Sequence, residues 1–65
     1  MKIIIRFIQP IPYDVNKKIP DRETDILLPM GTVIRIGNEY QDWVVERIVC
    51  FPDEKEIIIF AGIQR

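Results

Sequence analysis

Few side chains in this sequence could perform catalysis. Serine and histidine are absent from its 65 residues, which excludes Ser-His triads, Cys-His pairs and imidazole bases. The only cysteine, Cys50, lies between Val49 and Phe51, a pattern that predicts a buried and inert thiol. Asp42 and Glu46 could form a carboxylate pair, but nothing around them indicates acid-base function, so solvated surface charge is expected. We predict that the protein is not an enzyme.

Cofactor and metal sites are equally unsupported by the sequence. One thiol without any histidine cannot build a metal site or close an internal disulfide. The sequence has neither a glycine-rich phosphate loop nor a calcium-loop spacing. We therefore expect no cofactor and no bound metal.

Aromatic and guanidinium side chains could instead form a binding patch. Aromatic rings can stack on a base or a proline, and arginines can bind phosphate or carboxylate. For Trp43 we favour a core position, whereas Tyr40 could be core or exposed, and Tyr13 could anchor a loop or contact a partner. The candidate binding residues are Tyr40, Arg35, Arg47, Trp43 and Tyr13.

Charge and hydropathy limit the class of partner. The formal net charge is -1 and the basic residues are dispersed, whereas a duplex-binding domain usually carries a basic stripe. No segment approaches the roughly 20 apolar residues that cross a bilayer, and Arg6 interrupts the apolar N-terminal run. We expect a cytoplasmic protein that binds neither duplex nucleic acid nor membrane. Because so short a chain has a small core, we also expect a homo-oligomer.

The pattern of apolar residues and turn residues predicts a single β domain over residues 1–65. Alternation indicates strands at 2–8, 32–36 and 56–63, and residues 25–28 form a further apolar element. Turn signals occur at 29–31, 37–38 and 51–56, and the charged stretch 16–25 is expected to be a solvated loop. We predict an all-β fold, either a small SH3-like barrel or a strongly curved antiparallel meander of 4–5 strands.

Residues 39–51 are compatible with two structures. Asn38 could cap a helix over 39–51, which would make the fold α+β, but the valines and isoleucines of this stretch favour a strand. In a strand, the three-residue apolar spacing requires extra residues that reset the alternation. Bulges at Gln41-Asp42 and at Glu46-Arg47 would supply them and would curl the sheet.

The hairpin before this strand has two possible registers. A four-residue loop at 37–40 pairs Ile34 with Trp43 and Arg35 with Asp42, which leaves Tyr40 at an exposed tip. A three-residue loop pairs Ile36 with Tyr40 and makes the tyrosine part of the core. Register therefore decides whether Tyr40 can bind a partner.

The stretches "LLPMGTVIRIGNEY" and "VVERIVCFPDEKEIIIF" resemble small uncharacterised β-rich proteins of phages and mobile elements. The resemblance covers the C-terminal half, and this chain carries Gln41-Asp42-Trp43 where the pattern is shorter. It implies no catalytic residues and suggests a role in binding and inhibiting a host factor. The matching residues are Leu28, Pro29, Gly31, Gly37, Tyr40, Val45, Ile48, Lys55, Ile57 and Ile59.

Three functions follow as hypotheses. The first is a self-associating binding module, derived from a phage or mobile element, that inhibits a host defence component in the host cytoplasm. Its target would be a protein or a small signalling nucleotide, and a nucleotide would bind at a subunit interface. The second is a structural or adaptor module that binds one protein. The third is single-strand nucleic-acid binding through the aromatic and arginine residues.

Overall fold

The computed structural model describes residues 1–9, 19–36 and 41–64, and this part of the chain is all-β. Alternating and β-branched residues form its strands, as the sequence predicts. Residues 42–51 are a strand, so a helix over 39–51 is excluded. The strands are β1 (Lys2–Phe7), β2 (Arg22–Thr24), β3 (Val33–Arg35), β4 (Asp42–Phe51) and β5 (Glu56–Ile63).

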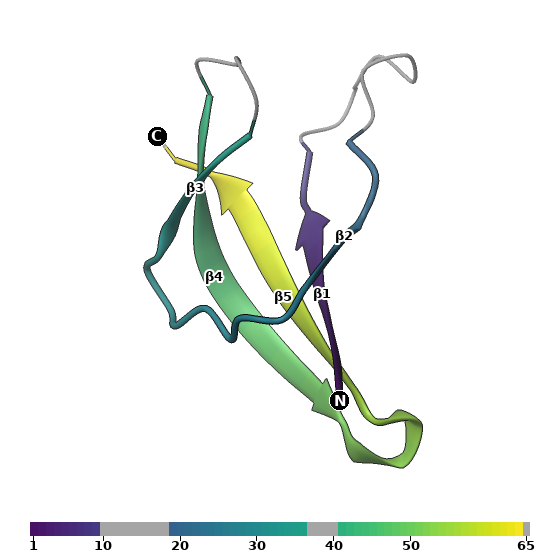
Figure 1. Ribbon diagram of the computed structural model, residues 1–65. Coiled ribbons are helices and arrows are strands. Elements are labelled where there is room, and N and C mark those ends of the chain that lie inside the picture. The colour runs from purple at the N-terminus through teal and green to yellow at the C-terminus, as the bar shows by residue number, and fades with distance from the viewer. Residues whose placement is uncertain (10–18, 37–40, 65) are drawn as a thin grey trace.

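The five strands form one sheet in the order β2-β1-β5-β4-β3, curled into an open half-barrel (Figure 1). Neighbouring strands are antiparallel except β1 and β5, which run parallel, with Ile3 opposite Ile57 and Ile5 opposite Ile59. This parallel pair departs from a purely antiparallel meander. It places the first and last strands side by side in the middle of the sheet.

The inner face of the curled sheet holds the core. The row of partners Phe7–Ala61 continues across to Val45 of β4, and the partners Ile5 and Ile59 form the next row. These five side chains are buried, as is Trp43, which lies opposite Ile63. Residues Ile19, Leu28, Ile34 and Ile36 pack against them from outside the central strands.

A β-bulge at Glu46 adapts β4 to this core. Val45 pairs with Ala61 and Arg47 with Phe60, so Glu46 is an extra residue without a partner on β5. The extra residue resets the alternation and allows Val45 and Ile48 to share the inner face although they are three positions apart. The bulge predicted at Glu46-Arg47 is confirmed. The one predicted at Gln41-Asp42 adjoins residues 37–40, which lie outside the described chain.

Residues 25–32, here called the crossing segment, pass over the inner face between β2 and β3 (Figure 1). The Thr32 amide donates to the Pro29 carbonyl at 3.2 Å, and the intervening Gly31 has φ +86°. This is the turn predicted at 29–31, and its third position requires the left-handed backbone that glycine tolerates. Hydrogen bonds from Gly31 N to Val45 O and from Val45 N to Thr32 O then attach the segment to β4.

Two sequence expectations require correction here. Residues 25–28 do not form a regular element, although Leu28 packs on the core. Strand β2 lies instead within the stretch expected to be a loop, where Glu23 pairs with Ile4 of β1.

The turn at 52–55 is present as a short 3₁₀ helix, η2 (Pro52–Glu54), which ends at Lys55 in a left-handed conformation.

Candidate functional site

The outer face of the sheet carries both apolar and charged side chains. Beyond the row Lys2–Glu56–Phe51, three rows of partners cross it, and the first joins Ile4, Ile58 and Val49. Ile58 is only 6% exposed, yet it does not belong to the core cluster. The other two rows are Arg6–Phe60–Arg47 and Gly62–Val44–Val33.

Two arginines flank Phe60 in the middle row. The Arg47 guanidinium lies over the Phe60 ring, 5.7 Å from its centroid, a geometry that permits a cation–π interaction. Arg6 is already engaged, because its Nε and Nη2 donate to the Asp21 carboxylate at 3.2 and 2.9 Å. The hydrogen bond and charge of Asp21 raise the pKa of Arg6 above its ordinary value. Arg47 is therefore the guanidinium in this row that remains open to a partner.

The bulge places Glu46 beside Arg47 on the outer face. A Cβ added to Gly62 would lie 2.8 Å from the Glu46 Cδ, so the Glu46 side chain occupies the space above this glycine. Consecutive residues at a bulge can point to the same side, unlike those of a regular strand. Within the described ranges, ion pairs join only Arg6 to Asp21 and Arg35 to Asp42, so Glu46 and Arg47 are both unpaired.

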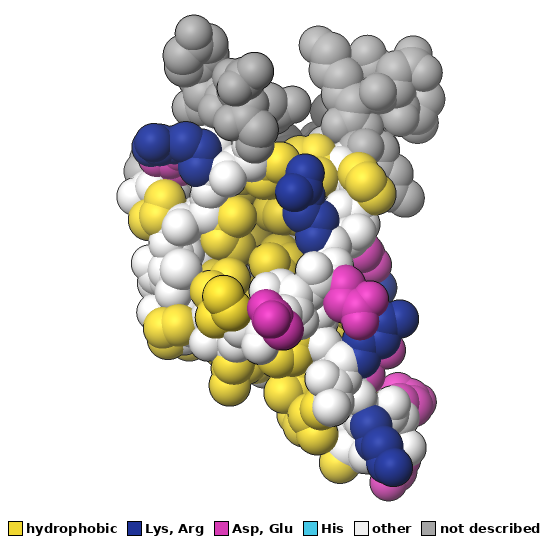
Figure 2. Space-filling model, viewed as in Figure 1, with side chains coloured by type: hydrophobic (Ala, Val, Ile, Leu, Met, Phe, Trp, Pro, Cys, Tyr) yellow, Lys and Arg dark blue, Asp and Glu magenta, His cyan; other side chains and the backbone are white. Residues whose placement is uncertain are grey.

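A second apolar surface lies on the crossing segment. Ile26, Leu27 and Met30 are 60%, 55% and 59% exposed, and Figure 2 shows hydrophobic side chains gathered on this side of the molecule. The segment is nevertheless held at several points, because Leu28 packs inward and the Ile26 amide donates to Thr24 Oγ1 at 3.2 Å. We call Ile26, Leu27 and Met30 the crossing-segment surface.

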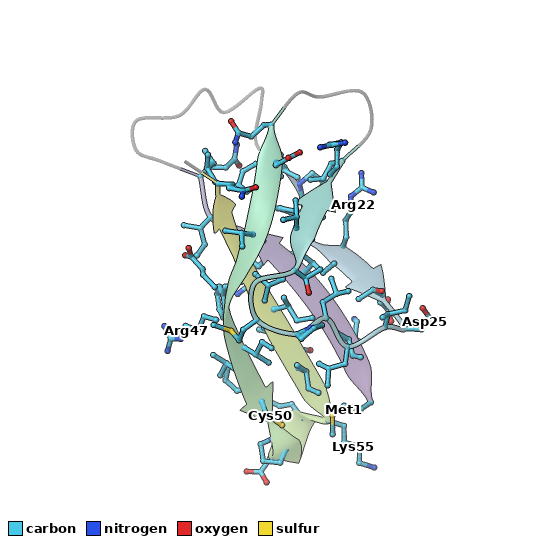
Figure 3. All side chains as sticks on the ribbon, turned by 90° about the vertical axis from the view of Figure 1, so that its left-hand side faces the viewer. Met1, Arg22, Asp25, Arg47, Cys50 and Lys55 are labelled. Atoms are coloured by element: carbon cyan, nitrogen blue, oxygen red, sulfur yellow. The ribbon has the colours of Figure 1, made fainter. Side chains whose placement is uncertain are left out.

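The two surfaces lie on opposite sides of the sheet. Leu28 of the crossing segment packs on the inner core, whereas Arg47 lies in an outer row. Figure 3 shows Arg47 beside β4 and Asp25, at the start of the crossing segment, at the opposite edge of the molecule. Cys50 pairs with Ile57 and so belongs to the inner face. Its thiol is free and exposed, so the expectation that it is buried is wrong. The reason is that the crossing segment attaches to β4 at Val45 and does not cover this end of the strand.

The predicted aromatic and arginine patch is not assembled among the described residues. Trp43 is 3% exposed and belongs to the core, which confirms the position favoured from the sequence. Its indole Nε1 has no hydrogen-bond partner among the residues that the structure describes. Arg35 is held by Asp42, with Nε to Oδ1 at 2.8 Å and Nη2 to Oδ2 at 3.0 Å. Arg47 lies on the outer face, away from Trp43.

Register resolves part of the question about Tyr40. Ile34 pairs with Trp43 and Arg35 with Asp42, which is the register of the four-residue loop. Tyr40 itself and Tyr13 lie outside the described residues. The sequence analysis overlooked Phe60 and Glu46 as outer-face residues. Strict alternation in "EIIIFAGI" could have placed Phe60 there, opposite the inner Ile59 and Ala61.

The described part of the chain contains no group of three acidic or cysteine side chains able to hold a metal ion. None of its elements is a helix long and apolar enough to span a bilayer. No protein-family model, curated protein or solved structure matches the chain.

Proposed function

We propose that this chain is a non-enzymatic binding module that recognises a protein through its crossing-segment surface. The observation that supports this is the exposure of Ile26, Leu27 and Met30 on a segment fixed to the sheet. Clusters of exposed apolar side chains on a well-anchored segment are typical of interaction sites. Anchoring also lowers the entropy lost when a partner binds, because the segment is already ordered.

Charge around this surface indicates the chemistry of the partner. Glu23 and Asp25 precede the surface and are exposed. Neither forms an ion pair with another described residue, whereas Asp21 is neutralised by Arg6. A partner segment that combines apolar side chains with lysine or arginine would satisfy both features. The resemblance to small phage proteins is our reason for proposing a host defence protein as the target.

Binding can be tested with matched variants. The wild-type protein and the variant I26D/L27D/M30D are immobilised and exposed to extracts of cells that carry the gene. A protein that is retained by the wild type is then purified, and its affinity for both forms is measured by calorimetry. The expected result is one saturable partner that the triple variant binds at least tenfold more weakly, since hot-spot side chains contribute about 2 kcal/mol or more each.

Lys55→Asp serves as the control, because Lys55 is exposed in the turn between β4 and β5 and belongs to neither the crossing segment nor the outer face. Equal binding of the purified partner by the wild type and the triple variant would refute this surface as the site. A thermal-shift screen with signalling nucleotides tests the other class of target. If a nucleotide raises the melting temperature of the wild type and of I26D/L27D/M30D equally, the target is a nucleotide and not a protein.

A further inference from the structure

The outer face lacks the second layer that normally covers an apolar sheet face. No described element packs over it, and the row Ile4–Ile58–Val49 is apolar across three strands. Phe60, Val44 and Val33 extend the apolar area toward the other end of the sheet, and Phe51 continues it on β4. Phe51 and Val33 are 37% and 49% exposed. This apolar strip is therefore open to a second layer.

The charges on this face favour a second copy of the same chain. Glu46 and Arg47 are adjacent, carry opposite charges, lie on the same face and have no ion-pair partner among the described residues. A two-fold axis near the bulge would bring Glu46 of each copy to Arg47 of the other. A two-fold interface uses the same patch twice, and this patch is complementary to itself in charge and in apolar character.

We propose that two copies pack outer face to outer face around a two-fold axis near the β4 bulge, and form a dimer with reciprocal Glu46–Arg47 ion pairs. The two sheets form the layers of a sandwich with a core of Ile4, Val49, Ile58 and Phe60. Both crossing-segment surfaces then face outward, so the dimer presents its partner-binding surface twice. This inference does not depend on the proposed function, because it uses the opposite side of the sheet.

A charge-exchange series tests the interface. Sedimentation equilibrium gives the mass of the wild type, E46R, R47E and the double variant E46R/R47E from low micromolar to several hundred micromolar concentration. Each single reversal places like charges opposite each other and is expected to raise the dimer dissociation constant about tenfold or more. The double variant restores opposite charges and is expected to return toward the wild-type value. A monomeric wild type at all concentrations overturns the proposal, as does a dimer that neither reversal weakens.

A second pair of measurements separates the outer face from the inner one. Val49→Lys is expected to yield a monomer, whereas Met30→Lys on the opposite side leaves the dimer intact; circular dichroism and Trp43 fluorescence verify that both are folded. Cys50 faces the inner side, so its rate of reaction with a thiol reagent should stay unchanged as the dimer forms. Protection of Cys50 on association would place the interface on the inner face and overturn the proposal.

Discussion

The Trp43 indole meets the Phe7 ring edge to face, with centroids 5.2 Å apart and ring planes at 72°. The contact joins β4 to β1 across the inner side of β5. Edge-to-face pairs contribute about 0.5–1.5 kcal/mol beyond the burial of their surface. In a domain this small, one such contact is a substantial part of the total stability.

Replacement of Trp43 should separate packing from hydrogen bonding. Trp43→Ala is expected to remove about 3–5 kcal/mol, which is about the whole stability of a small core, and to leave the chain unfolded. Trp43→Phe also removes the unbonded Nε1, a buried donor that costs about 1–3 kcal/mol, so its net loss should stay below about 2 kcal/mol. Circular dichroism without denaturant shows whether Trp43→Ala is folded, and urea denaturation measures the loss in Trp43→Phe. Equal damage from the two substitutions would contradict the assignment.

The Arg35–Asp42 pair predicts a pH dependence of stability. Its hydrogen bond and charge lower the pKa of Asp42 below the ordinary value of 3.8. A carboxyl whose folded pKa is depressed stabilises the fold above its unfolded pKa, and this contribution is lost as the pH falls through the folded pKa. Arg35→Gln should therefore be less stable than the wild type at pH 7, by a small amount because the pair is exposed.

That difference should disappear below the folded pKa of Asp42. Unfolding in urea at neutral and strongly acidic pH measures it. Arg22→Gln is the matched control, because it removes the same charge from an edge strand where the described residues provide no ion-pair partner. A difference between Arg35→Gln and the wild type that persists in strong acid would show that the ion pair is not its cause.

Deletion of one residue from β4 should reveal the role of the bulge. Removal of Glu46 leaves Val45 opposite Ala61 and Arg47 opposite Phe60, so every side chain keeps its face and only the local bend is lost. Removal of Val44 shifts the residues before it by one and turns Trp43 away from the core. The first variant should fold with reduced stability and the second should not fold. Circular dichroism and thermal unfolding distinguish these outcomes, and equal effects would refute the assigned register.

Gly31 should tolerate few substitutions, although a larger side chain would meet no neighbouring atom at this position. A Cβ at this position would meet no atom within 4 Å, but φ is +86°. Gly31→Ala is therefore expected to cost about 1 kcal/mol through backbone strain alone. Gly31→Asn should cost less, because asparagine enters the left-handed region more readily. Chemical denaturation of the two variants and the wild type tests this difference. A Gly31→Ala variant as stable as the wild type would argue against a strained turn.

Strands with a buried face could be predicted from the sequence, because alternation of side chains records burial directly. In β4 even the bulge could be located, since Val45 and Ile48 break the alternation. Strand β2 could not, because its three residues "RET" lie at the edge of the sheet and bury little. The parallel pairing of β1 with β5 could not be predicted either, since an apolar run does not specify which strand it pairs with.

The candidate site was only partly predictable for the same reason. Arg47 was identified by its type, but its position over Phe60 depends on the pairing of β4 with β5 and on the bulge. Arg35 also looked like a ligand-binding group until the register placed it opposite Asp42. The crossing-segment surface could not be predicted, because the sequence pattern assigns Ile26 and Leu27 to an apolar element. Only the three-dimensional path of residues 25–32 leaves them in solvent.

The parallel pairing of β1 with β5 also determines when the chain can fold. Lys2 pairs with Glu56 and Phe7 with Ala61, so each contact closes a loop of nearly the whole chain, and such non-local contacts form slowly. During synthesis, β1 emerges first and has only the three residues of β2 to pair with among the described strands until β5 leaves the ribosome. The hairpin of β4 and β5 is local and can form as soon as it is made. The nascent chain therefore acquires its core in one late step, in which the N-terminal strand docks on a hairpin that has already formed.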